Sequence, residues 1–311
     1  MELLKSIDQI RGDITSSSLT VGTFDGMHQG HLYLIDKMLK YSNSNSQPSV
    51  VVTFNPNPFT VLNNINKQKY HLIAKKDKYD ILDLLGIDFL LELEFDGKMA
   101  EIRAEDFFKD YIINPFNPQN IVIGYDHHFG KNRRGNEVFL KENESKYGYT
   151  LTVVKPFNIE GMTVSSSAIR ELVNTGNIAS ANRYLGRNYK IKGEVIKGNG
   201  VGRELEFPTA NIKVDTISQI IPQNGVYFIK TKINNKNYDG MCNIGYRPTV
   251  SSENTMSIEV HIFNYSNFDL YAQFIEVEFV DYVRNEKKFK NKEELKLQLI
   301  KDKQHCKSLQ I

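Results

Sequence analysis

Two histidines near the start of the chain are spaced to bind an anion. His28 and His31 lie in Gly22-Thr-Phe-Asp-Gly-Met-His-Gln-Gly-His31, which follows a short run of apolar and β-branched residues at 19–21. Apolar residues then recur at helical spacing, so the histidines stand where a helix begins after a strand. Unpaired backbone N–H groups and the positive end of the helix dipole attract anions at such a position. The pattern predicts a phosphate site.

The residues alone leave two other interpretations of this segment open. Two histidines three residues apart also occur in metal sites, although no cysteine or third ligand lies near them in the sequence. They are equally compatible with an ordinary polar loop, because motifs this short arise by chance. Gly22, Gly26 and Gly30 let the backbone turn tightly and approach a ligand closely.

A group of hydroxyls followed by an arginine indicates a second phosphate contact. The segment Val164-Ser-Ser-Ser-Ala-Ile-Arg170 is expected to open a helix after the fifth strand. Capping of that helix explains one serine. Three hydroxyls with an arginine one turn later also form a phosphate clamp, since arginine binds phosphate through paired hydrogen bonds.

The second half of the chain carries polar residues on expected strands. Thr209 and Asn211 are two apart and share a face, and their oxygen atoms suit Mg²⁺. Glu259 lies on the polar face of the alternating segment 256–262, where a carboxylate can accept a proton from a hydroxyl. The alternative is that all three are ordinary polar residues of exposed strands. The glycine-rich segment 198–203 lacks the lysine of a P-loop, so a hairpin loop is its simpler interpretation.

Strand-like and helix-like segments alternate over residues 1–186, which predicts βαβ units, a parallel sheet and helices on both faces. The expected strands are 19–21, 50–54, 87–95, 120–124 and 149–154. One expected helix runs from Lys75 and stops at Gly86, and another near Phe107 ends before Pro115. Because ligands bind beyond the carboxyl ends of such strands, the candidate residues are expected at one edge of the sheet.

The pattern changes near residue 186. Six short strand-like runs follow with no helix between them, which predicts a small antiparallel barrel or sandwich. They are 189–196, 210–214, 226–230, 238–244, 256–263 and 273–280, and a lysine-rich helix is expected at 291–303. We therefore expect two domains, 1–186 and 187–311, which a length of 311 residues accommodates.

The composition is that of a globular protein without features of nucleic-acid or membrane binding. The chain has 39 basic and 37 acidic side chains and a net charge of +2, which gives no electrostatic case for either partner. No apolar run approaches the ~20 residues that cross a bilayer, and the first residues lack the apolar core of a signal peptide. The two cysteines, Cys242 and Cys306, exclude a disulfide framework and fit the cytoplasm.

In their order and spacing, the segments of the first half resemble the prokaryotic FAD synthetase domain of the nucleotidyltransferase superfamily, over about residues 12–185. The resemblance is carried by the two phosphate segments, by Thr53-Phe-Asn-Pro-Asn-Pro58 and by Gly124-Tyr-Asp-His-His-Phe-Gly130. It implies a Rossmann-like fold with a parallel sheet. The ATP phosphates would bind Gly22, Asp25, His28, Gly30, His31, Ser165, Ser166 and Arg170. Asn55, Pro56, Pro58 and Asp126 would lie beside the flavin and the nucleotide.

Residues 187–311 resemble the riboflavin kinase family. The resemblance is carried by Phe207-Pro-Thr-Ala-Asn211, Asn243-Ile-Gly-Tyr-Arg-Pro-Thr249 and Glu259-Val-His-Ile262. It implies a six-stranded antiparallel barrel followed by a helix. Thr209 and Asn211 would hold Mg-ATP, Glu259 would be the base for the ribityl 5′-hydroxyl, and Arg284 would lie near the flavin. The glycine-rich loop, with Gly198, Gly200, Gly202 and Arg203, would cover the nucleotide.

The two resemblances together imply a bifunctional enzyme that uses ATP with Mg²⁺, phosphorylates riboflavin to FMN and adenylylates FMN to FAD. Two positions depart from the family patterns. Asp126-His-His-Phe-Gly130 stands where Asp-Phe-Arg-Phe-Gly is common, and Ala272 replaces a usual glycine, where we expect local backbone adjustment. The first departure leaves an active kinase with a degenerate first domain as an alternative. A flavin- or nucleotide-sensing module without turnover is a third hypothesis, which the presence of Glu259 argues against.

Overall fold

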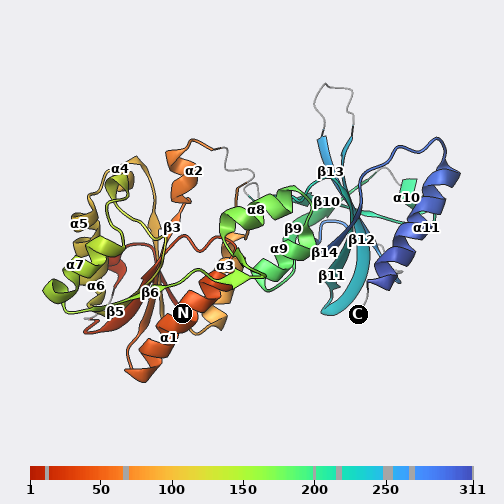
Figure 1. Cartoon of the computed structure of the whole chain (residues 1–311). Coiled ribbons are helices and arrows are strands. Elements are labelled where there is room, and N and C mark those ends of the chain that lie inside the picture. Colours follow the sequence, from red (N-terminus) through yellow and green to blue (C-terminus); the bar gives the residue numbers. More distant parts are fainter. Residues whose placement is uncertain are drawn as a thin grey trace. The chain divides into compact units, whose positions relative to one another are not determined.

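A computed structural model describes residues 1–10, 14–65, 70–198, 201–214, 219–247, 255–265 and 270–309. The chain divides into two compact units, Met1–Ser166 and Ser167–Ile311 (Figure 1). Helices α8 (Ser166–Asn174) and α9 (Ile178–Leu185) precede the boundary that the sequence suggested after residue 186. Asn182 of α9 donates a hydrogen bond to the Phe279 carbonyl oxygen (2.8 Å) within the second unit.

The first unit is built on a six-stranded sheet in the order β1-β4-β3-β2-β5-β6, and every neighbouring pair is parallel. The strands are β1 (Glu2–Leu4), β2 (Ser17–Val21), β3 (Ser49–Asn55), β4 (Phe89–Glu94), β5 (Pro118–Gly124) and β6 (Thr150–Val154). A separate hairpin pairs β7 (Asn158–Ile159) with β8 (Met162–Thr163). The predicted parallel α/β architecture is confirmed.

Both faces of this sheet are covered. The longer helices are α1 (Gln29–Ser44), α3 (Lys75–Leu84) and α7 (Glu137–Tyr147). The shorter ones are η1 (Ile7–Gln9), α2 (Pro58–Leu62), α4 (Gly97–Ala100), α5 (Ala104–Phe107), η2 (Phe108–Ile113), α6 (Asn114–Phe116) and η3 (Lys131–Arg133). Val50 and Val52 pack in one apolar cluster with α5, η2 and α7, while Val51 packs in the other with α1 and α3. Successive side chains of a strand point to opposite faces, so a continuous valine run suits a sheet buried on both sides.

Two expectations for the first unit are corrected. The strand β1 was not predicted, because three residues are too few to show a pattern and its parallel pairing to β4 involves residues far along the chain. The helical stretch near Phe107 does not end before Pro115 but runs through a π-helical segment into α6, which includes this proline. Pro115 is the second residue of α6, and proline is tolerated in the first turn of a helix, where the backbone N–H needs no partner within the helix.

The second unit is a closed barrel in the strand order β10-β13-β12-β11-β14-β9, with antiparallel neighbours. The strands are β9 (Tyr189–Ile196), β10 (Ala210–Val214), β11 (Gly225–Ile233), β12 (Lys236–Arg247), β13 (Thr255–Ile262) and β14 (Phe274–Arg284). They confirm the six predicted strands. The expectation of no helix between them was wrong, because the four-residue α10 (Val201–Glu204) lies between β9 and β10.

Helix α11 (Lys292–Ser308) packs on the outside of the barrel. Its Cys306 joins a buried apolar cluster with Val226, Phe228 and Met241 of the strands. Strand neighbours such as Tyr227 point the other way, into the barrel, and are fully buried. The α11 side is therefore the outer face of the sheet, which fixes the orientation of every side chain in the same cross-strand rows.

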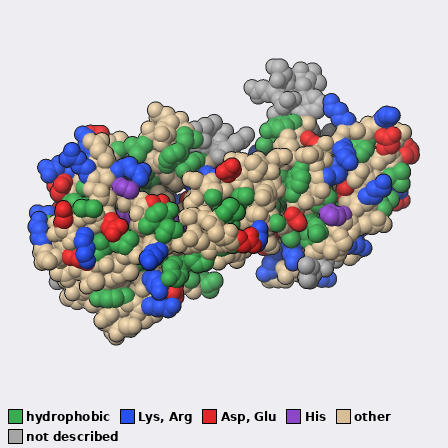
Figure 2. All heavy atoms as spheres, viewed as in Figure 1, with side chains coloured by type: hydrophobic (Ala, Val, Ile, Leu, Met, Phe, Trp, Pro, Cys, Tyr) green, Lys and Arg blue, Asp and Glu red, His purple; other side chains and the backbone are tan. Residues whose placement is uncertain are grey.

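On the face shown in Figure 2, basic and acidic side chains are interspersed, in keeping with the near balance of charge. Among the described residues, none of the helices is both long enough and apolar enough to span a membrane.

Ala272 has a φ of 59°, in the left-handed region that glycine adopts with less strain.

Candidate active sites

The first candidate site lies at one edge of the parallel sheet. Gly22 directly follows β2, Asn55 is the last residue of β3, and Asp126 comes two residues after β5. After β6 and the β7–β8 hairpin, Ser166 Oγ donates a hydrogen bond to the Asp25 carbonyl oxygen (2.8 Å), which brings the start of α8 to this edge. These four strands are neighbours in the sheet. Their carboxyl ends therefore bring the predicted segments together, at the usual ligand position of a parallel sheet.

His28 and His31 begin helix α1. His28 is the N-cap residue and is only 5% exposed, and its Nδ1 accepts a hydrogen bond from the His31 backbone N–H (3.3 Å). An Nδ1 that accepts leaves the proton of a neutral imidazole on Nε2, which makes Nε2 a donor. The two rings stack with centroids 3.6 Å apart. A Cβ on Gly30 would lie 3.2 Å from the His28 ring, so a glycine at this position gives the stacked pair room.

The turn between β2 and α1 is strained and tightly held. Phe24 and Met27 have φ values of 49° and 41°, which are unfavourable for residues with a Cβ, and both are buried. Asp25 is also buried, and its Oδ1 accepts a hydrogen bond from the Leu72 backbone N–H (2.9 Å). Asp25 was assigned to the phosphate site. In the structure its carboxylate helps to hold this turn, and its role at the phosphates stays a prediction.

The proline turn after β3 has a defined local structure. The Asn55–Pro56 peptide bond is cis, and Pro58 is the first residue of the short helix α2. Asn57 caps this helix by accepting a hydrogen bond from the Phe59 backbone N–H (3.0 Å). The sequence suggested only a turn here, because a five-residue helix shows no apolar period. The roles of Asn55, Pro56 and Pro58 at a flavin stay predictions.

The turn after β5 shows how the chain accommodates its departure from the family pattern. His127 has a buried Nε2, and desolvation lowers the pKa of the ring to about 4, with a smaller contribution from His128. His127 is therefore neutral at physiological pH. His128 Nδ1 lies 2.7 Å from the Asp126 carbonyl oxygen and 3.0 Å from Arg133 Nη2. A guanidinium thus lies at this turn even though position 128 is not an arginine.

Arg170 lies four residues after Ser166 on α8, so the two side chains share a face of that helix. The division between the units falls directly after Ser166, and Arg170 belongs to the second unit. The assignment of Arg170 to the phosphate site stays a prediction.

The second candidate site is a row of polar residues across the outer face of the barrel. Glu259 of β13 pairs in register with Asn211 of β10 on one side and with Asn243 of β12 on the other. Asn243 in turn pairs with Val226, whose side chain faces α11. Directly paired residues point to the same face of a sheet, so all three polar side chains lie outside the barrel. The predicted residues Asn211 and Glu259 are therefore brought together.

The glycine-rich segment packs directly on these residues. A Cβ on Gly198 would lie 1.9 Å from Asn211 Nδ2, and a Cβ on Gly202 would lie 2.4 Å from the Phe207 carbonyl oxygen and 3.2 Å from Thr209 Oγ1. Only residues without a Cβ let the backbone approach this closely. Gly200 lies outside the described residues, and so does the side chain of Arg203, whose backbone is part of α10.

Arg284 lies at the end of the same row. It pairs with Val226 of β11, and its guanidinium binds Asp302 of α11 through Nε (2.9 Å) and Nη2 (2.7 Å). Asp302 is buried, so this ion pair fixes α11 to β14. The structure thus gives Arg284 a clear structural partner, and its predicted proximity to flavin stays untested.

Comparisons with known proteins assign the two parts of the chain to two families. A model of the FAD synthetase family matches residues 11–168, and a model of the riboflavin kinase family matches residues 185–310. The bifunctional riboflavin kinase/FMN adenylyltransferase of Buchnera aphidicola is 36% identical over 97% of this chain and 96% of its own length. The enzyme of the same name from Bacillus subtilis is 34% identical over 96% of this chain and 93% of its own. The chain belongs to the bifunctional riboflavin kinase/FMN adenylyltransferase family.

A solved structure has the same fold as this chain over nearly its whole length. It comes from Streptococcus pneumoniae, is titled a macrolide-efflux protein, and is 29% identical with a TM-score of 0.89 over 98% of both chains. The efflux activity in that title is stated of that protein. The two family models and the curated relatives agree on a different pair of activities.

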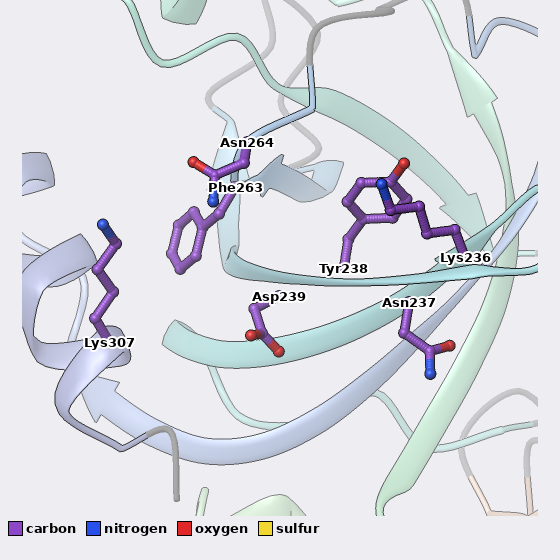
Figure 3. Close-up of a pocket in the computed structure, with 7 residues that line it drawn as sticks. All are labelled: Lys236, Asn237, Tyr238, Asp239, Phe263, Asn264 and Lys307. Atoms are coloured by element: carbon purple, nitrogen blue, oxygen red, sulfur yellow. The ribbon is translucent and has the colours of Figure 1, made fainter.

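The kinase-family barrel also has a hollow away from the predicted residues. Its volume is about 490 Å³, and it lies beside the β11–β12 hairpin and the end of α11 (Figure 3). Its lining residues are Lys236, Asn237, Tyr238, Asp239, Phe263, Asn264 and Lys307. None of them belongs to a motif of the bifunctional family quoted above, and exposed lysines alone do not define a binding site.

Sequence reasoning missed one residue of this kinase unit beside the candidate site. His261 follows Glu259 by two positions on the same outer face, and its Nδ1 donates to the Pro208 carbonyl oxygen (2.9 Å). Its Nε2 is buried and has no hydrogen-bond partner among the described residues. His261 therefore fixes the turn that carries Thr209. The alternation of the strand placed it on the polar face, but only the fold shows its contact with residue 208.

Proposed function

We propose that this chain phosphorylates riboflavin to FMN on the barrel and adenylylates FMN to FAD on the parallel sheet. One observation carries the proposal best: two different family models match successive parts of the chain, residues 11–168 and residues 185–310. The curated relatives are named for both activities, and this chain matches more than nine-tenths of the length of each.

In the kinase unit, we assign Glu259 as the general base. Its carboxylate would accept the proton of the ribityl 5′-hydroxyl as that oxygen attacks the γ-phosphorus of ATP, and ADP would leave. A positioned base typically contributes about 10²–10⁴-fold to such a step. The pairing of Glu259 with Asn211, which is assigned to Mg-ATP, supports this role.

The donors near this base fit Mg²⁺ that arrives with ATP. Thr209 and Asn211 offer a hydroxyl and an amide oxygen, which are hard ligands, and the close approach of Gly198 and Gly202 leaves a compact cradle around them. No group of three or more His, Cys, Asp or Glu in the described part of the chain could hold a metal ion. Sharing the ion with phosphate oxygens and water suits such a sparse set of ligands. Bound Mg²⁺ would neutralise phosphate charge during transfer.

In the adenylyltransferase unit, we assign His28 and His31 to the ATP phosphates. An FMN phosphate oxygen would attack the α-phosphorus of ATP in line, and pyrophosphate would leave. This reaction needs no covalent help from the protein, so positioning and stabilisation of charge carry the rate. The position of both histidines at the beginning of α1 supports this assignment, because the first backbone N–H groups of a helix attract negative charge.

One alternative has a specific observation in its favour. The Asp126-His-His sequence departs from the family pattern, which would suit an active kinase with a degenerate first domain. The guanidinium of Arg133 beside His128 supports retained binding at this turn.

For the location of the enzyme, we propose the cytoplasm, since Cys242 and Cys306 are both buried and unpaired with each other.

The proposal is tested by incubating the protein with riboflavin and Mg-ATP and separating the products. We expect FMN first and then FAD. Accumulation of FMN with no FAD, also when FMN is the starting substrate, would favour the kinase with a degenerate first domain. Riboflavin that stays unchanged would refute both enzymatic proposals and leave the sensing module.

A further inference from the structure

A lysine is buried directly beneath the first candidate site. Lys78 lies on α3 and is only 8% exposed. Its Nζ donates to Thr53 Oγ1 (3.2 Å) and to the Thr23 carbonyl oxygen (3.4 Å). Thr53 Oγ1 itself donates to the same carbonyl oxygen (3.3 Å). The three groups therefore form a closed triangle of hydrogen bonds.

This triangle joins the two strands that carry candidate residues. Thr23 belongs to the strained turn that leads from β2 to His28, and Thr53 precedes Asn55 by two residues on β3. The same turn is held on its other sides by Ser166 and by the backbone N–H of Leu72. Lys78 is thus a further brace, and it reinforces the direct hydrogen bond between Thr53 of β3 and the turn.

Lys78 is an expensive choice for a purely structural brace. Burial of an ammonium without a counter-ion is unfavourable. The carboxylate of the nearby Glu92 binds Lys5 and Lys75 (2.7 Å for Lys75). Among the described residues, Lys78 Nζ has no carboxylate partner. A methionine would occupy similar space without this cost, so the charge itself calls for a function.

We propose that Lys78 is a positioning residue for adenylyl transfer, whose protonated amine clamps the turn that carries His28 to the end of β3. The proposal rests on the adenylyltransferase function assigned above. Lys78 acts through Thr23 and Thr53 and does not need to touch a substrate. When the ammonium loses its proton, it keeps two N–H donors but loses its positive charge, so its hydrogen bonds to Thr53 and to the Thr23 carbonyl weaken and the clamp loosens.

The charge of Lys78 changes within reach of ordinary assays. Burial lowers the pKa of Lys78 to about 8, since desolvation outweighs the attraction of Glu92 on β4 and of Asp25 in the turn. Lys75 on α3 and Lys5 after β1 lower this pKa further by repulsion. The clamp is therefore strongest at neutral pH and weakens as the pH rises through about 8. Adenylylation is expected to decline over the same range.

The test compares Lys78→Met, Lys78→Arg and the control Lys76→Met from pH 6.5 to 9.5. The control makes the same chemical change on the same helix, at an exposed lysine that pairs with Asp80. FMN and Mg-ATP are the substrates, and kcat and KM for FAD formation are measured separately. Thermal unfolding of each variant checks that it is folded.

We expect Lys78→Met to lower kcat about 10- to 100-fold at pH 7, the size of effect that small misplacements of reacting groups produce, with KM changed far less. Lys78→Arg should retain most activity at pH 7 and lose the decline near pH 8, because a guanidinium stays charged. Lys76→Met should match the wild type. A Lys78→Met enzyme with wild-type kcat, or a Lys78→Arg enzyme that keeps the decline near pH 8, would overturn the proposal.

Two further outcomes are separated by the same design. If Lys78→Met does not fold, the pH profiles of the wild type and Lys78→Arg decide the question alone. If the wild type forms no FAD at any pH, the adenylyltransferase function itself fails, and with it the role of Lys78.

Discussion

The role proposed for His28 depends on its position at the beginning of α1. Its ring is buried, stacked on His31 and fixed by the hydrogen bond that Nδ1 accepts from the next turn. This arrangement leaves little rotational freedom, so the donor on Nε2 points in one direction before substrate binds. Preorganised donors of this kind stabilise the charge of a transition state without a cost of reorientation.

We expect His28→Ala and His31→Ala each to lower FAD formation from FMN by a factor on the order of 10²–10³, as for the loss of one transition-state donor. The measurement is steady-state kinetics with FMN and Mg-ATP. His305→Ala, on the exposed side of α11, is the control and should have no effect. Wild-type rates in both variants would remove the histidines from the mechanism.

Lys78 also has a consequence for stability. The pKa of Lys78 is lowered in the folded state, so above about pH 8 the folded protein releases a proton that the unfolded chain keeps up to its usual pKa of 10.5. Deprotonation of Lys78 therefore raises the free energy of unfolding by up to about 3 kcal/mol as the pH rises through that window.

Lys78→Met isolates this contribution. The free energy of unfolding of the variant, compared with that of the wild type, should be most favourable at pH 7. This relative advantage should disappear between pH 8 and 10.5. Denaturant unfolding of both proteins across this range measures the difference. A difference that is constant with pH would show that Lys78 does not titrate in the folded protein as described.

At the scale of elements, the local patterns that repeat were predictable and the isolated ones were not. Alternation located the six barrel strands, since each is half buried and shows its period over five or more residues. The strand β1 and the helices α2 and α10 are three to five residues long and show no period. The helical stretch through Pro115 depends on a π-helical segment that no simple period reveals.

The candidate sites divide in the same way. Thr209, Asn211 and Glu259 stand out in the sequence, because they lie on expected strands within segments that resemble a family. The contacts of Lys78 and His261 do not, because their partners Thr53 and Pro208 are 25 and 53 positions away in the chain. Only the fold brings such pairs into contact.

The glycine-rich segment before β10 offers a test at this scale. In Gly198→Ala, the new Cβ would lie 1.9 Å from Asn211 Nδ2 and would displace that amide. We expect KM for Mg-ATP in riboflavin phosphorylation to rise about tenfold, one order of magnitude for a misplaced ligand. FMN adenylylation should be unchanged. Gly97→Ala, where a Cβ meets open space, is the control. An unchanged KM for Mg-ATP would show that Asn211 does not take part in nucleotide binding.

Ala272 tests the strain in the turn before β14. Its φ of 59° is unfavourable for alanine and acceptable for glycine. Ala272→Gly should leave the free energy of unfolding unchanged or raise it by up to about 1 kcal/mol, because relief of strain competes with a more flexible unfolded chain. Ala272→Val should be clearly destabilising, since a β-branched side chain fits this conformation poorly. Equal melting temperatures for both variants would contradict the assigned conformation.

At the scale of the whole molecule, the two units divide the chemistry of one vitamin. Each has its own apolar core, and each places its candidate residues on a different kind of scaffold. The first uses the carboxyl ends of parallel strands, and the second uses the outer face of a closed barrel. A substitution in one unit is therefore expected to leave the chemistry of the other intact.

Glu259→Gln and His28→Ala, each assayed with riboflavin and with FMN as the starting substrate, test this division most directly. Glu259→Gln should phosphorylate riboflavin about 10²–10⁴-fold more slowly, the usual contribution of a general base, and still convert FMN to FAD at the wild-type rate. His28→Ala should make FMN normally and fail to make FAD. If either variant lost both activities while remaining folded, or if Glu259→Gln impaired only the adenylylation of FMN, two separate active sites on these two units would be contradicted.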